Sequence, residues 1–125
     1  MSVESTIYAA LKDLVSGRVY RDIVKHGDEQ LLPRITFQQV GGRPVNYLEG
    51  GKPSKKNARI QINSWHTRRD DAMALGRLVA DTMRATATLA PTVLTEMVAS
   101  HEPGVGPNGA DLYGAHQDFS VWFDD

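Results

Sequence analysis

Histidines are the residues of this chain that could most readily support metal or acid–base chemistry. The four of them stand at positions 26, 66, 101 and 116, without the i,i+4 spacing of a helical metal motif or the short spacing of a zinc-binding sequence. His101 and His116 flank a predicted loop, so their rings could meet across a hairpin with Asp111 or Asp118 nearby. A small metal-binding domain built on His101, His116 and Asp111 therefore stays open as an alternative, although ordinary surface histidines are favoured.

The Gly51-Lys52 pair invites comparison with a phosphate-binding loop. The motif requires a glycine where this chain has Asn46, and Lys52 is followed by Pro53 instead of Ser or Thr. A backbone cradle for phosphate needs those glycines and a helix directly after them. The sequence predicts no phosphate site here.

Nucleophilic chemistry also lacks a suitable pattern. No serine lies in a nucleophile elbow, and Ser64 falls in a strand-like segment where a small residue facing the core is the simpler interpretation. There is no cysteine, which removes disulfides, thiolate catalysis and cysteine-based zinc sites. We expect no catalytic residue and no cofactor.

Hydrophobic periodicity predicts which elements would position any site. We expect helices over 2–16 and 68–89, and strands over 18–21, 34–40, 58–65, 92–100 and 116–123. Strict alternation at Ile60 and Ile62, and at Phe119 and Val121, indicates strands with one buried face. The 125 residues fit a single domain, 1–125, with long loops at 41–57 and 102–115. The expected fold class is α+β: a mainly antiparallel sheet with two helices packed on one face.

Two tryptophans fall on the sheet face away from the predicted helices. Trp65 alternates with Ile60 and Ile62, and Trp122 alternates with Phe119 and Val121. Exposed tryptophan is enriched at the centres of protein interfaces because it buries a large area at low entropic cost. We predict that Trp65 and Trp122 bind a partner; the alternative is that the 41–57 loop folds back and covers them.

The 41–57 loop is cationic. It carries Arg43, Lys52, Lys55 and Lys56 against one acid, Glu49. Nucleic-acid binding is an alternative, but the loop has a single aromatic residue for stacking, and the whole chain has a net charge of -1 and a pI near 6.4. We predict instead that these four cations bind an acidic protein surface.

Neither a secretory signal nor an apolar run of the roughly 20 residues needed to span a bilayer is visible in the sequence. We therefore expect a soluble cytoplasmic protein without membrane partners and without specific nucleic-acid binding.

Four segments give the chain a family resemblance. They are RVY at 18–20, LPRITF at 32–37, RIQINSW at 59–65, and LY at 112–113 followed by DFSVWF at 118–123. In this order they span nearly the whole chain, and the sequence resembles the bacteriophage tail completion proteins, also called tail terminator or tail-to-head joining proteins.

The resemblance implies a virion structural protein without enzymatic activity. Such proteins form a ring, typically a hexamer of identical copies, that caps the tail tube and joins the tail to the neck of the head. The implied partners are further copies of itself, the tail tube protein and a head-completion or neck protein. The implied location is the tail–head junction of the virion, with assembly in the host cytoplasm. Another neck or tail assembly component is an alternative within the same class.

Overall fold

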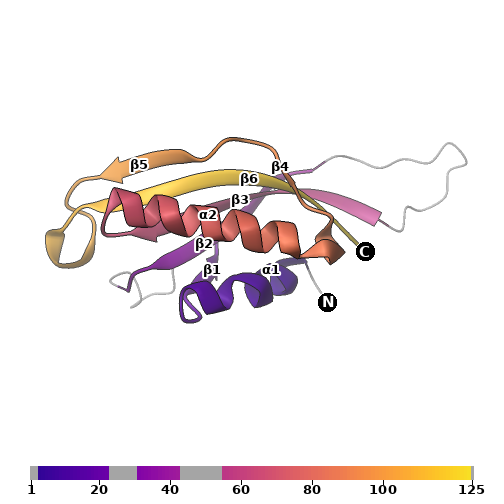
Figure 1. Cartoon of the computed structure of the whole chain (residues 1–125), viewed down its shortest axis with the longest axis horizontal. Coiled ribbons are helices and arrows are strands. Elements are labelled where there is room, and N and C mark those ends of the chain that lie inside the picture. The colour runs from indigo at the N-terminus through magenta and orange to yellow at the C-terminus, as the bar shows by residue number, and fades with distance from the viewer. Residues whose placement is uncertain (1–2, 23–30, 43–54, 125) are drawn as a thin grey trace, which may run out of the picture.

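The computed structural model describes residues 3–22, 31–42 and 55–124, except for the side chains of Lys55 and Asp124. The elements in chain order are α1 (Val3–Leu11), η1 (Lys12–Leu14), β1 (Val19–Arg21), β2 (Arg34–Gly41), β3 (Lys55–His66), α2 (Arg69–Ala85), η2 (Ala87–Leu89), β4 (Thr92–Val93), β5 (Val98–Glu102), η3 (Pro107–Gly109) and β6 (Leu112–Asp124). Two α-helices and a mostly antiparallel six-stranded sheet confirm the α+β prediction (Figure 1).

The sheet is organised around one long central pair of strands. Its order is β1-β2-β3-β6-β4, and β5 also pairs with β6, beyond β4 along the same edge. Strands β3 and β6 pair from Lys55 opposite Asp124 to His66 opposite Tyr113. Only β1 is parallel to its neighbour, β2, among the described strands.

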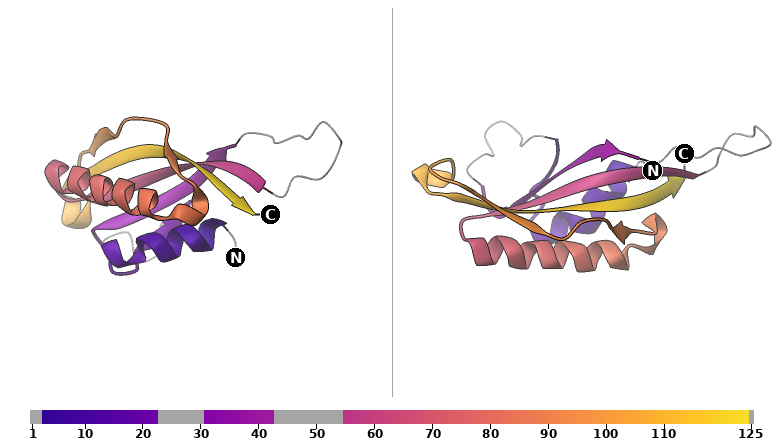
Figure 2. Two further views of the ribbon diagram at one scale, coloured as in Figure 1. Left: turned by 45° about the vertical axis from the view of Figure 1, so that its right-hand side comes forward. Right: turned by 90° about the horizontal axis from the view of Figure 1, so that it is seen from above.

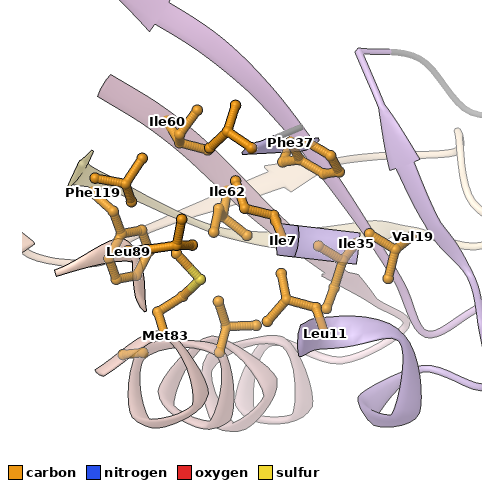
Figure 3. Close-up of a cluster of buried hydrophobic side chains, with 14 of the residues drawn as sticks. Ile7, Leu11, Val19, Ile35, Phe37, Ile60, Ile62, Met83, Leu89 and Phe119 are labelled. Atoms are coloured by element: carbon orange, nitrogen blue, oxygen red, sulfur yellow. The ribbon is translucent and has the colours of Figure 1, made fainter. Parts of the chain in front are cut away.

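A single hydrophobic core lies between the sheet and the two helices. α1 contributes Val3, Ile7 and Leu11, and α2 contributes Leu75, Val79 and Met83, each set spaced four residues apart. These spacings place each set on one face of its helix. The sheet contributes alternate residues, including Ile35, Phe37, Ile60, Ile62 and Phe119, and Figure 3 shows several of these side chains meeting those of the helices.

A buried polar contact fastens α2 to β6. The Nε2 atom of Gln117, on the helix-facing side of β6, donates to the main-chain oxygen of Gly76 at 2.7 Å. Gly76 also gives the side chain of Met97 room to pack against the helix, because a Cβ at this position would collide with the Met97 sulfur. The glycine inside α2 therefore has a packing reason, despite its cost to helix stability.

Several boundaries differ from the sequence prediction. The predicted 92–100 strand is two strands, and the second loop is shorter than 102–115 because β6 already begins at Leu112. β3 begins at Lys55, before the predicted start at 58.

Helix α2 also differs from the sequence prediction, both in the residue at which it ends and in the exposure of one residue. It ends at Ala85 and a short 3₁₀ turn carries Leu89 into the core. Leu78, predicted in the buried stripe, is 51% exposed because it is one residue, or about 100° of helix rotation, from Val79.

No helix in the described part of the chain is long and apolar enough to cross a membrane.

Candidate interaction surface on the open face of the sheet

The face of the sheet turned away from the helices is the candidate site. We call it the open face, since none of the described helices covers it; Figure 2 shows α2 on the other side of the β3–β6 pair. Strand alternation and register assign to it Thr36 and Gln38 of β2, Arg59, Gln61, Asn63 and Trp65 of β3, Val98 and Ser100 of β5, and His116, Asp118, Ser120 and Trp122 of β6.

Trp65 and Trp122 both lie on the open face, and both are half-buried. The indole Nε1 of Trp65 donates to Thr36 Oγ1 at 3.0 Å, and its ring meets His116 edge-on at a centroid distance of 5.2 Å. Contacts within its own chain therefore fix the indole of Trp65. Trp122 pairs with Asn57, eight residues before Trp65 on β3, so the two tryptophans lie roughly 26 Å apart along the strand. They do not form one cluster.

A row of hydrogen-bonded side chains crosses the open face over four strands. Nε2 of His116 lies 2.6 Å from Ser100 Oγ, and Nδ1 lies 2.6 Å from Asn63 Oδ1. Nδ2 of Asn63 donates to Thr36 Oγ1 at 3.3 Å. Because a carbonyl oxygen only accepts, Nδ1 of His116 carries the proton and Nε2 accepts from the Ser100 hydroxyl when the ring is neutral.

The ring of His116 is biased toward its neutral form. Burial lowers the pKa of His116 below its ordinary value of 6.5, and the nearby carboxylate of Glu102 opposes this effect more weakly. A neutral ring satisfies both of its neighbours in the row. The polar row is therefore a network of hydrogen bonds within the chain, and it fixes side chains of the open face.

The charged pair on this face is satisfied within the chain. The guanidinium of Arg59 meets Asp118 Oδ2 with Nη2 at 2.7 Å and Nε at 2.9 Å, and the Asp118 side chain is largely buried. The main-chain N–H of Asp118 donates in turn to Thr95 Oγ1 at 3.0 Å. Since Arg59 is neutralised, it gives no support to nucleic-acid binding at this face.

The predicted cationic residues are only partly described. Arg43 and Lys52 lie outside the described residues, and the side chain of Lys55 does too, although its backbone pairs with that of Asp124. Lys56 is exposed, opposite Phe123 and one residue from the Asn57–Trp122 pair. Lys56 alternates with Ala58 and Ile60, so its side chain lies on the helix-facing side of β3, whereas Trp122 lies on the open face. The structure therefore does not bring Lys56 and Trp122 together on one face, and Trp65 lies at the far end of the open face from Trp122.

The alternative in which His101 and His116 converge is not what the structure shows. Val98 pairs with His116, so alternation puts Ser100 beside His116 and turns His101 to the helix-facing side. There His101 Nε2 lies 2.8 Å from Asp111 Oδ2, and its ring stacks on Tyr113 at a centroid distance of 4.6 Å. The hydrogen bond from His101 lowers the pKa of Asp111, and one from the Gly104 N–H adds to the effect.

No group of three or more metal-binding side chains occurs among the described residues. Sequence reasoning missed the polar row, although alternation places Asn63 and His116 on the same face as the tryptophans.

The fold and this surface define a small α+β domain whose polar side chains on the open face are engaged with one another. The family model described as tail completion protein gp17 matches residues 6–124, and the chain belongs to that family. It is therefore a structural protein of the bacteriophage tail completion class.

A solved structure described as the virion of a native gene transfer agent particle shares the fold, with a TM-score of 0.52 and 15% identity, covering 99% of this chain and 96% of that chain. A second, with 14% identity, covers 100% of this chain and 99% of that chain, and its TM-score of 0.44 is too low to support an argument. No curated protein gives a match to the sequence.

Proposed function

We propose that copies of this chain form a ring that caps the tail tube at its final length and joins the tail to the neck of the head. The observation that carries the proposal is the family match, which extends over residues 6–124 and so includes every sheet strand. The open face supports it, because its side chains are fixed by internal hydrogen bonds and are ready to meet a partner without reordering.

Two regions of the described surface suit contact with partners. Trp122 on the open face and Lys56 on the helix-facing side both lie at one end of the β3–β6 pair. We expect Trp122 to bury apolar area against a neighbouring copy, and Lys56 to meet an acidic surface on the tube or on a neighbouring copy. The side chains of Arg43, Lys52 and Lys55 lie outside the described part of the chain, and their binding to the same acidic surface is proposed from the sequence alone. Trp65 is the weaker candidate, since its indole already bonds to Thr36 and packs on His116.

The proposed role requires no catalysis and no cofactor. The partners are other copies of the chain in a ring, with six as the expected number, the tail tube protein and a head-completion or neck protein. The finished ring belongs at the tail–head junction of the virion, and assembly takes place in the host cytoplasm.

The test is deletion of the gene from the phage that encodes it, followed by electron microscopy of the particles. Overlong tails, or tails without heads, are expected, and a plasmid carrying the wild-type chain should restore joined particles of uniform tail length. Tails of normal length attached to heads in the deletion strain would overturn the proposal.

The proposed role of the lysines in binding an acidic partner has a separate test. Replacing Lys52, Lys55 and Lys56 with Glu should leave folding intact and fail to restore complete particles. A normal yield from the triple variant would refute a role for these lysines while leaving the capping proposal in place.

A further inference from the structure

The outer edge of β5 has backbone groups without a partner in the described structure. The main-chain oxygen of Asp118 accepts from Leu94 at 2.9 Å, so the even-numbered residues of β6 direct their backbone groups toward β4 and β5. These even-numbered residues of β6 pair with Val98, Ser100 and Glu102 of β5, so the backbone groups of those three residues form the hydrogen bonds to β6. The backbone groups of Ala99 and His101 point outward, and no described backbone group bonds to them.

Glu102, the last residue of β5, carries a charge, but the strand has no other device that protects this edge. Natural proteins block exposed edges with lysine, proline, a bulge or an inward-pointing charge. Residues 98–102 contain no lysine and no proline, and their pairing with β6 runs without a register shift. Val98 is 61% exposed on the open face. An unguarded edge of this kind is a template for an added strand.

The opposite edge of the sheet is β1 (Figure 1). Ile35 donates to the main-chain oxygen of Arg18 at 2.9 Å, and Asp22 donates to that of Phe37 at 2.8 Å. Residues 18, 20 and 22 therefore face β2, and the backbone groups of Arg21 point outward. The side chain of Arg21 is 63% exposed and lies on the helix-facing side, because Arg21 pairs with Phe37.

We propose that β5 of one copy pairs with β1 of the next copy, head to tail, so that the sheets run on from subunit to subunit around the ring. This inference rests on the proposed function. A ring of identical copies needs a contact between two different surfaces of each copy, and the two edges of one sheet meet that condition. Pairing of β5 with itself would instead close a dimer.

In this arrangement the outward-bonding residues of the two edge strands have their side chains on the same side of the sheet. Arg21 of β1 and both Ala99 and His101 of β5 direct their backbone groups outward and their side chains to the helix-facing side. A continued sheet would therefore keep helices on one side and open faces on the other. Since β1 has three residues and β5 has five, each contact is small. Free copies then stay apart, and the ring forms where the tube gathers them at high local concentration.

The absence of cysteine allows a direct test by cross-linking. Arg21→Cys and Ala99→Cys would be made as single variants, shown to restore complete particles, and co-expressed in the deletion strain. Purified particles would be treated with a short bifunctional thiol reagent. We expect cross-linked dimers from the co-expressed pair, a ladder up to the full ring from the double variant, and no cross-link from either single variant alone.

Other cross-linking results would overturn the inference. Dimers from Ala99→Cys alone would show β5 pairing with itself. No product from any combination, in particles that are complete, would show that the two edges do not meet.

A charge on the edge gives a second test. Val98→Lys places a lysine on β5, and Leu78→Lys is the control, since Leu78 is also an exposed apolar residue but lies on α2. Both purified variants should fold with an unchanged circular dichroism spectrum. Val98→Lys should lose the ability to complete particles, and Leu78→Lys should keep it.

The two proposals fail in different ways. If the deletion strain makes normal particles, both the capping function and this inference are refuted. If the deletion strain makes defective particles but Val98→Lys completes particles, only the edge contact is refuted.

Discussion

The ring of Trp65 occupies the space that a side chain at position 114 would take. Trp65 and Gly114 are directly paired across β3 and β6, and a Cβ on Gly114 would lie 2.8 Å from Cζ3 of the indole. The same Cβ would lie 2.7 Å from Ser100 Oγ and 3.0 Å from His116 Nε2. An aromatic ring laid across a glycine on the next strand protects a weak point of a sheet. Trp65 is therefore first of all a structural residue.

Gly114→Ala should destabilise the domain by about 1–3 kcal/mol, because the added methyl group forces the indole and the polar row apart. Urea unfolding followed by circular dichroism measures the effect. In a Trp65→Leu background the same substitution should cost less, since the smaller side chain can yield. An equal cost in both backgrounds would show that the indole does not set the requirement for glycine.

Ser64→Ala should leave stability unchanged or raise it by up to about 1–2 kcal/mol. Ser64 is 0% exposed on the core side of β3, and its hydroxyl has no hydrogen-bond partner. The matched control is Ser100→Ala, which removes a hydroxyl bonded to His116 and should cost about 1 kcal/mol. Equal losses from both variants in urea unfolding would contradict this difference in hydrogen bonding.

Stability should fall as the pH is lowered through the titration of His116. Its folded-state pKa is below the unfolded value, which is near 6.5, so the unfolded chain binds more protons between the two values. The stabilising contribution of the neutral ring is complete above the unfolded pKa and is lost as the pH falls from there through the folded pKa. The free energy of unfolding, measured from about pH 7.5 to pH 5, should show this loss.

His116→Gln is the control for the pH experiment, because glutamine keeps hydrogen-bonding capacity without titrating. The variant should lose less stability than the wild type over the same range. Parallel curves for the two proteins would mean that protonation of His116 does not contribute.

Trp122→Ala separates an interface role from a core role. If Trp122 serves a partner, the variant should fold, with a small loss in stability, and fail to complete particles. Trp65→Ala should destabilise the isolated domain more, since it loses a hydrogen bond and a ring contact. A Trp122→Ala domain that unfolds, measured by the same urea titration, would assign Trp122 to the core.

Alternation was the signal that carried the fold prediction. Ile60, Ile62, Phe119 and Val121 are all buried in the core, as their period of two indicates. The same rule could have excluded the alternative in which His101 and His116 meet, but only with the pairing of β5 and β6 known. Register between distant strands depends on tertiary packing, and a single strand pattern does not contain it.

The division of the predicted 92–100 strand has a local cause that the pattern could not show. Thr95 accepts a hydrogen bond from the Asp118 main chain, in place of a backbone partner, and the chain leaves the edge of β6 between β4 and β5. Side chains of this type compete with the strand ladder. The parallel pairing of β1 was missed for a related reason, because three residues carry too little pattern to specify a partner.

The position of β6 affects how the protein can be made. This strand follows β3, β4 and β5 in the chain, yet all three depend on it for pairing. A nascent chain that ends before Leu112 cannot close its sheet, so these three strands have open edges until β6 has been synthesised. Long-range pairing of this kind folds slowly and leaves a chain open to aggregation or to chaperones in the meantime. Synthesis rate, as much as sequence, should therefore govern how much of this protein reaches its native state in an infected cell.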